Sequence, residues 1–164
     1  MTEPQDLVDS SHYRPLFKLL KAMDDDIAEL YTEAGVAGFR PKFTGPLIRL
    51  GRADSMSIRE LADAMDVTHS AMSQNAAAMR RAGLVRDARS DDARTRRVRL
   101  TPKARALVPF LEDEWRATER AVIELDAEIA YPIAQVVRDI EAALARTSFA
   151  ERLRENLAAL RDKG

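Results

Sequence analysis

Small polar side chains and arginines gather between Ser57 and Thr101, and they are the groups in this chain best suited to bind a polyanion. Hydroxyl and amide groups lie on one face of a predicted helix over residues 69–82, and such groups hydrogen-bond to base edges without the repulsion that acidic groups would cause. Six arginines fall within the fourteen positions from 86 to 99, and guanidinium groups neutralise phosphates. The outer side of this helix comprises the polar residues Thr68, His69, Ser70, Ser73 and Gln74 together with Ala77, and the arginines are Arg86, Arg89, Arg94, Arg96, Arg97 and Arg99.

The charge distribution favours a polyanionic partner, although the net charge of the whole chain is −1. Residues 52–103 contain 11 Lys+Arg and 7 Asp+Glu, a net charge of +4, whereas the rest of the chain contains 15 and 20, a net charge of −5. Because local positive charge is what neutralises phosphates, the overall balance does not argue against nucleic-acid binding.

The elements that position these side chains are predicted to be two helices and a hairpin. Ser57 and Glu60 have the spacing of a capping box, which begins a first short helix. Thr68 is a suitable N-cap for the second helix, which turns Met72, Ala76 and Met79 inward, and Gly83 suits its C-terminal end. A strand is predicted to open at residues 84–85, a polar turn to occupy 89–93, and a second strand to return over 95–100.

Each of these features has an alternative, purely structural interpretation. A helix pair is also a common packing unit, and arginines on a hairpin also discourage the pairing of edge strands. In this order, however, the helix pair and the arginine-rich hairpin predict a winged helix-turn-helix.

Helices are also predicted before and after this segment. Apolar residues recur at helical spacing over residues 11–33 and 102–129. A short helix is predicted over 42–51, in which Pro46 either introduces a kink or marks the first turn. Pro132 interrupts the last long stripe of apolar residues, which resumes over Ile133, Val136, Val137, Ile140 and Leu144. The capping-box pair Ser148 and Glu151 then predicts a final helix.

The apolar stripes of these outer helices are too long for the central segment to bury. They either pack on one another within one chain, as a bundle, or intertwine with the helices of a second copy. The second arrangement suits DNA better, because a two-fold dimer places two recognition helices about one helical turn apart.

The chain resembles the MarR family of bacterial transcriptional regulators over nearly all of its length. The most specific segment is MDVTHSAMSQNAAAMRRAGLVRDARSDDARTRRVRLTPKA, which is similar to the family's recognition helix, Asp-x-Arg wing and Leu-Thr-Pro helix start. The resemblance implies a mostly α fold with a small β-wing, in which a winged helix-turn-helix is flanked by N- and C-terminal dimerisation helices. The implied division is 1–35 for the N-terminal arm, 36–101 for DNA binding and 102–164 for C-terminal dimerisation.

The resemblance also implies the function and the residues that perform it. It implies a homodimer that binds double-stranded DNA at a pseudo-palindromic operator, most often as a repressor, with recognition helices in major grooves and wings in minor grooves. The implied DNA contacts on the wing include Asp92, which orients Arg94, together with Arg96 and Arg97. Asn75 stands where the family usually has an apolar residue, and it either bonds back to the helix–turn region or meets DNA.

Many family members respond to a small, often aromatic or anionic ligand bound between the arms and the DNA-binding segment. Bulky residues expected near that cleft are candidates to line it, with Arg14, Arg40 and Lys42 as sources of positive charge. Ordinary core or dimer packing is the alternative role for these aromatic side chains. The candidate pocket residues are His12, Tyr13, Phe17, Phe43 and Trp115.

Other classes of function have weaker support in the sequence. The absence of cysteine excludes disulfides and thiolate metal sites, and no spacing of acidic residues or histidines indicates an enzyme, a cofactor or a metal. The acidic, polar N-terminus is no signal peptide and no apolar run is long enough to span a membrane, so a cytoplasmic protein is expected. The remaining alternative is a winged-helix adaptor that binds an acidic protein without DNA specificity.

Overall fold

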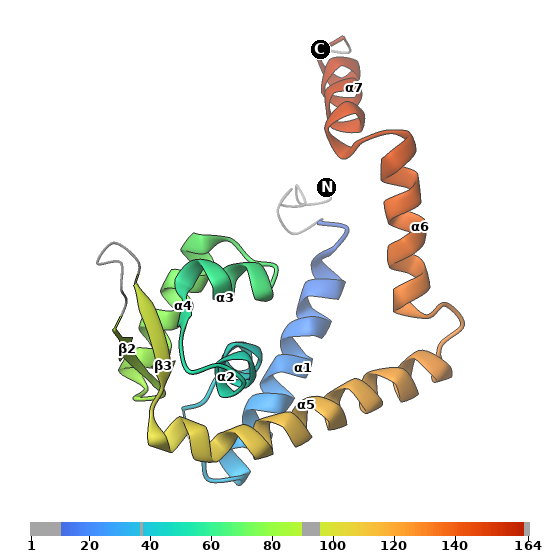
Figure 1. Cartoon of the computed structure of the whole chain (residues 1–164). Helices are drawn as coiled ribbons and strands as arrows, with labels where there is room; N and C mark the ends of the chain where they lie inside the picture. The colour runs from blue at the N-terminus through green and yellow to red at the C-terminus, as the bar shows by residue number, and fades with distance from the viewer. Residues whose placement is uncertain (1–10, 37, 90–95, 163–164) are drawn as a thin grey trace, which may run out of the picture. The chain divides into compact units, whose positions relative to one another are not determined.

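The computed structural model describes residues 11–36, 38–89 and 96–162, and it confirms a mostly helical fold with one small antiparallel sheet. The chain divides into two compact units, Met1–Glu114 and Trp115–Gly164. In chain order the elements are α1 (Arg14–Glu33), the 3₁₀ turn η1 (Pro41–Phe43), α2 (Thr44–Gly51), β1 (Met56–Ser57), α3 (Ile58–Ala64), α4 (His69–Arg81), β2 (Val85–Ala88), β3 (Arg97–Leu100), α5 (Pro102–Glu128), α6 (Ile133–Arg146) and α7 (Phe149–Arg161) (Figure 1).

The helices begin where the sequence places capping residues. The Ser57 hydroxyl accepts a hydrogen bond from the Glu60 amide at 3.1 Å, and the Ser57 amide donates to a Glu60 carboxylate oxygen at 2.6 Å. Thr68 caps α4 by accepting from the Ala71 amide at 3.2 Å. A second capping box, formed by Ser148 and Glu151, begins α7. These bonds satisfy amides that have no partner inside the helix, which confirms the predicted helix starts.

Gly83 ends α4 in the left-handed region, with a φ of 69°. Its amide donates to the Arg80 carbonyl at 2.9 Å, and the Leu84 amide donates to the Met79 carbonyl at the same distance. A side chain at this φ would be strained, so glycine is the residue that allows the chain to turn directly from α4 into β2.

Pro46 lies in the first turn of α2, so it starts this helix rather than breaking it. The missing amide of proline costs nothing there, because amides of the first turn have no partner inside the helix. At the other end of α2, a Cβ on Gly51 would lie 2.9 Å from a methyl carbon of Val108. The absent side chain therefore allows close packing of α2 against α5.

The sheet has three strands in the order β1-β3-β2, and the first strand was not predicted. β2 pairs with β3 in antiparallel register, with Val85 opposite Leu100 and Asp87 opposite Val98. β1 adds two residues to the other edge of β3, with Met56 opposite Val98. The hairpin is thereby joined to the residues that immediately precede α3.

A buried hydrogen-bonded group joins three helices of the first unit. The Tyr31 hydroxyl, from α1, donates to a carboxylate oxygen of Glu114 in α5 at 2.6 Å, and it lies 2.5 Å from the Thr44 hydroxyl of α2. All three residues are buried. Burial, followed by the bond to Glu114, raises the pKa of the Tyr31 phenol far above its ordinary value, so it remains a protonated donor. Around this group the apolar core includes Phe39, Phe43, Leu47, Leu50, Leu61, Met72, Met79, Val98 and Leu111.

Replacing Tyr31 with phenylalanine is expected to lower the free energy of unfolding by about 1–3 kcal/mol. The substitution keeps the ring packed against Phe39 but removes the hydroxyl that bonds to buried Thr44 and Glu114. Urea unfolding followed by circular dichroism measures the change. Tyr13→Phe is the matched control, because the Tyr13 side chain is 52% exposed, and equal stability of the two variants would contradict the structural role of the buried group.

The second unit contains the end of α5 together with α6 and α7. None of the residues in α6 or in the described part of α7 is buried, although both helices carry an apolar stripe. Over the residues that the structure describes, no helix combines the length and the hydropathy that a membrane span requires. The exposed apolar residues of this unit include Val122, Ile123, Leu125, Ile133, Val137, Phe149, Leu153, Leu157 and Leu160.

Candidate nucleic-acid interface

The polar face of α4 is exposed as the sequence predicts. Met72, Ala76 and Met79 are buried on the inner side of the helix. On the outer side, the Thr68 hydroxyl still has its hydrogen available for donation, because it uses only an acceptor position in capping the helix. The positive end of the helix dipole adds to the attraction for a phosphate at this terminus. The exposed predicted contacts on this face are Thr68, His69, Ser70, Ser73 and Gln74.

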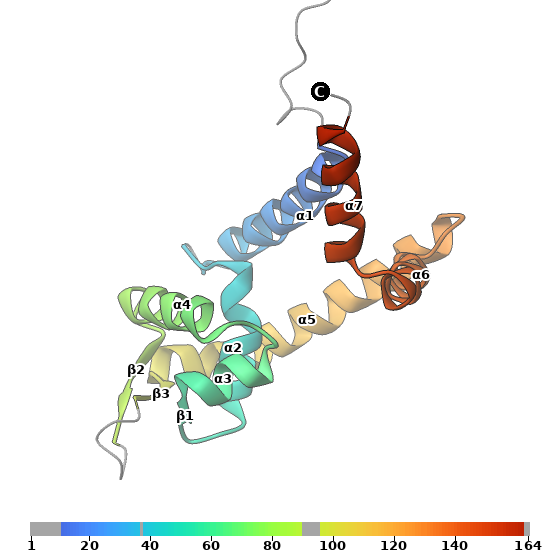
Figure 2. The same ribbon diagram turned by 90° about the horizontal axis from the view of Figure 1, so that it is seen from above.

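Two polar contacts hold α4 in place within the first unit. The Asn75 side-chain amide donates to the Lys42 carbonyl of η1 at 2.9 Å, a partner outside the helix–turn region. Near the C-terminal end of α4, Arg80 forms an ion pair with Asp87 of β2 at 2.8 Å. These contacts fix the helix to the segment before α2 and to the hairpin that follows it (Figure 2).

The hairpin after α4 carries the predicted wing residues. Asp92 and Arg94, the predicted minor-groove pair, lie outside the described residues. Arg89 and Arg96, at the two edges of the described part, are exposed. The described part of the hairpin thus presents exposed cations beside α4, as a wing requires.

Arg97 differs from the other predicted contacts because its guanidinium is bound within the protein. It donates to the Ser55 hydroxyl at 3.0 Å and to the Ser55 carbonyl at 2.8 Å, and it lies 3.2 Å from the Glu60 carboxylate. Glu60 also caps α3. The pKa of Glu60 lies below its ordinary value, mainly because the Ser57 amide donates a hydrogen bond to the carboxylate and in addition because of the Arg97 side chain. Arg97 therefore connects β3 to the loop and cap that start α3, a role that sequence spacing did not reveal.

Replacing Arg97 with alanine is expected to destabilise the fold by about 1–2 kcal/mol, because several internal hydrogen bonds are lost. DNA affinity should fall, but the dependence of affinity on salt should keep its slope, since the Arg97 charge already faces Glu60. Urea unfolding and salt titrations of duplex binding measure both effects, with Arg96→Ala as the matched control. A stable Arg97→Ala variant whose salt slope falls by about one would instead identify a direct phosphate contact.

The candidate ligand residues lie in different environments. Phe43 is 1% exposed and belongs to the core, where its ring contacts Phe39. Tyr13 and Phe17 are exposed near the start of α1, and His12 stacks edge-on against Tyr13. Trp115 is 45% exposed and belongs to the second unit. Packing is thus the observed role of Phe43, and the role of the other four in ligand binding stays a prediction.

The described residues contain no group of three or more His, Asp or Glu side chains arranged to hold a metal ion. The Tyr31–Thr44–Glu114 group is a buried polar cluster that residue spacing does not predict, because its members are separated by 13 and 83 positions. No local periodicity signals such a contact.

Comparison with known proteins relates one part of the chain to a known family. The model of the MarR family matches residues 47–97, which extend from α2 to the first residue of β3. A search of curated protein sequences finds no match.

Solved structures of transcriptional regulators share the fold. The regulator MOSR of M. tuberculosis, in complex with DNA, has 24% identity and a TM-score of 0.58, over 84% of this chain and 99% of that one. MepR of S. aureus, also in a DNA complex, has 16% identity and a TM-score of 0.57, over 84% and 96%. The regulator SlyA has 13% identity and a TM-score of 0.57, over 88% and 99%. Residues 47–97 therefore match the MarR family, and the chain shares the winged helix-turn-helix fold of these solved transcriptional regulators.

Proposed function

We propose that this protein is a sequence-specific DNA-binding repressor that acts as a homodimer on a pseudo-palindromic operator. The observation that carries the proposal is the exposed hydroxyl and amide face of α4, positioned next to an arginine-bearing hairpin. Small hydroxyl and amide groups suit direct contact with base edges in a major groove. The DNA complexes of MOSR and MepR support the same use of this fold.

In the proposed complex, the two parts of the DNA-binding segment have different tasks. Thr68, Ser70 and His69 contact phosphates at the start of α4, while Ser73 and Gln74 approach bases. Arg94 enters the minor groove, where the narrow width of A·T-rich DNA attracts a guanidinium, and Asp92 orients it. Residues 36–101 thus form the DNA-binding domain, between arms at 1–35 and 102–164 that hold the dimer.

Exposed apolar surface supports the proposed dimer. Along α1, Leu16, Leu19 and Leu20 are 40–53% exposed, and the second unit exposes large apolar residues on all of its helices. Patches of this extent are uncommon on monomers. A second copy of the chain would cover them and would supply the second recognition helix for the other half of the operator.

Release by a small aromatic or anionic ligand is the regulatory part of the proposal. His12, Tyr13, Phe17 and Trp115 are accessible aromatic side chains, and Arg14 and Arg40 supply positive charge. A ligand can act only if it binds the DNA-free dimer more tightly than the DNA-bound one. Aromatic carboxylates tested by thermal shift and by release from the operator reveal whether such an effector exists.

The function is tested by recovering bound fragments from genomic DNA, footprinting the best site and measuring its affinity against a scrambled duplex. We expect specific binding to an inverted repeat whose half-sites are about one helical turn apart. Absence of duplex binding at moderate salt would overturn the proposal in favour of an adaptor that docks an acidic protein. Binding with equal affinity to both duplexes would overturn its sequence specificity.

A further inference from the structure

An arginine-lined hollow lies on the side of the sheet that faces away from the core. Its volume is about 390 Å³. Arg86 comes from β2, Arg99 from β3 and Arg105 from the first turn of α5, so three separate elements each contribute an arginine to the lining. The remaining lining residues are Asp54, Leu100 and Pro102.

The strand register explains why two of these arginines adjoin each other. Arg86 is directly opposite Arg99 in the β2–β3 ladder, and the neighbouring pair, Val85 and Leu100, is buried in the core. Successive side chains of a strand point to opposite faces, so both arginines extend from the outer face of the sheet. Like charges directly opposite each other in a sheet are destabilising, so this arrangement has a cost unless an anion offsets it.

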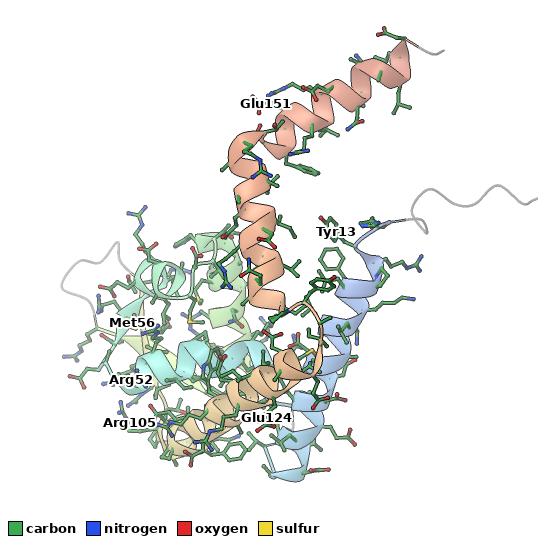
Figure 3. All side chains as sticks on the ribbon, turned by 90° about the vertical axis from the view of Figure 1, so that its right-hand side faces the viewer. Tyr13, Arg52, Met56, Arg105, Glu124 and Glu151 are labelled. Atoms are coloured by element: carbon green, nitrogen blue, oxygen red, sulfur yellow. The ribbon has the colours of Figure 1, made fainter. Side chains whose placement is uncertain are left out.

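Among the residues that the structure describes, no carboxylate forms an ion pair with these three arginines. Elsewhere in the first unit, Arg52 pairs with Glu112 at 3.2 Å, and Arg80 and Arg97 have carboxylate partners of their own. Within the described part of the chain, none of the three guanidinium groups makes a hydrogen bond, and Asp54 has no ion pair. Figure 3 shows the Arg105 side chain directed outward at the edge of the molecule that also bears Arg52 and Met56. The hollow therefore combines three available guanidinium groups with a single carboxylate.

We propose that Arg86, Arg99 and Arg105 form a binding site for a small phosphate-bearing anion, separate from the DNA-binding face. Guanidinium groups bind phosphate oxygens through paired, charge-assisted hydrogen bonds. A phosphate monoester has close to two negative charges at neutral pH and three acceptor oxygens, which suits three guanidiniums that converge on one hollow. A diphosphate group matches the same chemistry with more charge.

The location of the hollow favours a small anion over the DNA backbone. The inner side of α4 packs on the core through Met72, Ala76 and Met79, and the inner side of the sheet packs on the same core through Val85 and Val98. The polar face of α4 and the outer face of the sheet therefore point away from this shared core in different directions. A duplex lying on α4 does not need the outer face of the sheet, so the two binding events are independent.

Calorimetric titration with inorganic pyrophosphate at constant ionic strength tests the site in the full-length protein. The wild type is expected to bind, and the double variant R86Q/R99Q is expected to bind on the order of 10-fold more weakly or worse, because charge-assisted hydrogen bonds are lost. R105Q should show a smaller loss. The matched control is R120Q/R154Q, which makes the same change in net charge at two exposed arginines outside the hollow. Equal weakening in both double variants, or no binding by the wild type at millimolar pyrophosphate, would overturn the proposal.

Thermal unfolding and DNA binding provide two further readouts. Pyrophosphate should raise the melting temperature of the wild type but not that of R86Q/R99Q, because only an anion bound to the folded state stabilises it. Without pyrophosphate, the double variant should melt no lower than the wild type, since the repulsion between Arg86 and Arg99 is removed. Salt titration of duplex binding should give the same slope for both proteins. If the salt slope falls by about two in R86Q/R99Q, these arginines contact DNA phosphates and the proposal of a small-anion site is wrong. Absence of duplex binding by the wild type would overturn only the proposed function.

Discussion

A chain that ends at Thr147 is expected to sediment as a monomer. It should bind its operator on the order of 100-fold more weakly than the full chain, because two linked recognition helices bind one operator with higher avidity than a single helix. The truncation removes α7, whose Phe149 and Leu160 are 67% and 71% exposed and so are available to a second copy. Sedimentation velocity at micromolar concentration measures assembly, and fluorescence anisotropy on the operator measures affinity.

Point variants on the two faces of α7 separate loss of the dimer from loss of the helix. Leu153→Glu with Leu157→Glu alters the apolar stripe, whereas Arg154→Gln with Glu155→Gln alters neighbouring polar positions without a change in net charge. The leucine variant should behave like the truncated chain, and the polar variant should remain dimeric. A truncated chain that still sediments as a dimer would show that α7 is not the main dimer contact.

Replacing Gln74 with alanine is expected to cost about 1–3 kcal/mol per half-site on the operator, and much less on random DNA, because the amide is lost from a base edge. Arg94→Ala should weaken binding to both duplexes and reduce the salt slope by about one for each wing contact that is lost. Asp92→Ala should resemble a milder Arg94→Ala, since the arginine remains but loses the partner that orients it.

The comparison requires affinities of the three variants for operator and scrambled duplexes at several salt concentrations. Ala77→Ser is a suitable control on α4, because it adds a small hydroxyl to a half-buried position on the same helix without removing a predicted contact. Equal weakening of both duplexes by Gln74→Ala would mean that this side chain contacts the backbone and not a base. Unchanged affinities for Arg94→Ala would exclude the wing as a DNA contact.

Local interactions made much of this fold predictable from the sequence. The capping boxes at Ser57 and Ser148, the N-cap at Thr68 and the glycine that ends α4 each involve residues only a few positions apart. Such spacings are recognisable without knowledge of the fold, and the periodic apolar residues between them define the helices. The exposed face of α4 followed directly from these helix limits.

Contacts between distant parts of the chain were not predictable in the same way. β1 has only two residues and is a strand because Met56 lies opposite Val98, 42 positions later. Arg97 was expected to contact DNA, but whether a guanidinium faces solvent or Ser55 depends on the loop that folds against it. The burial of Phe43 likewise depends on α1, α2 and α4, which contact its segment, since that segment is a single 3₁₀ turn.

The hydrogen bond between Tyr31 and Glu114 also constrains how the chain can fold during synthesis. These residues are 83 positions apart, and Leu111, one turn before Glu114, belongs to the same core. A nascent chain that has emerged only as far as β3 lacks the carboxylate that binds Tyr31 and the apolar side chains that α5 contributes. The first unit therefore cannot complete its core until the first half of α5 has left the ribosome, and until then its apolar residues are available to chaperones.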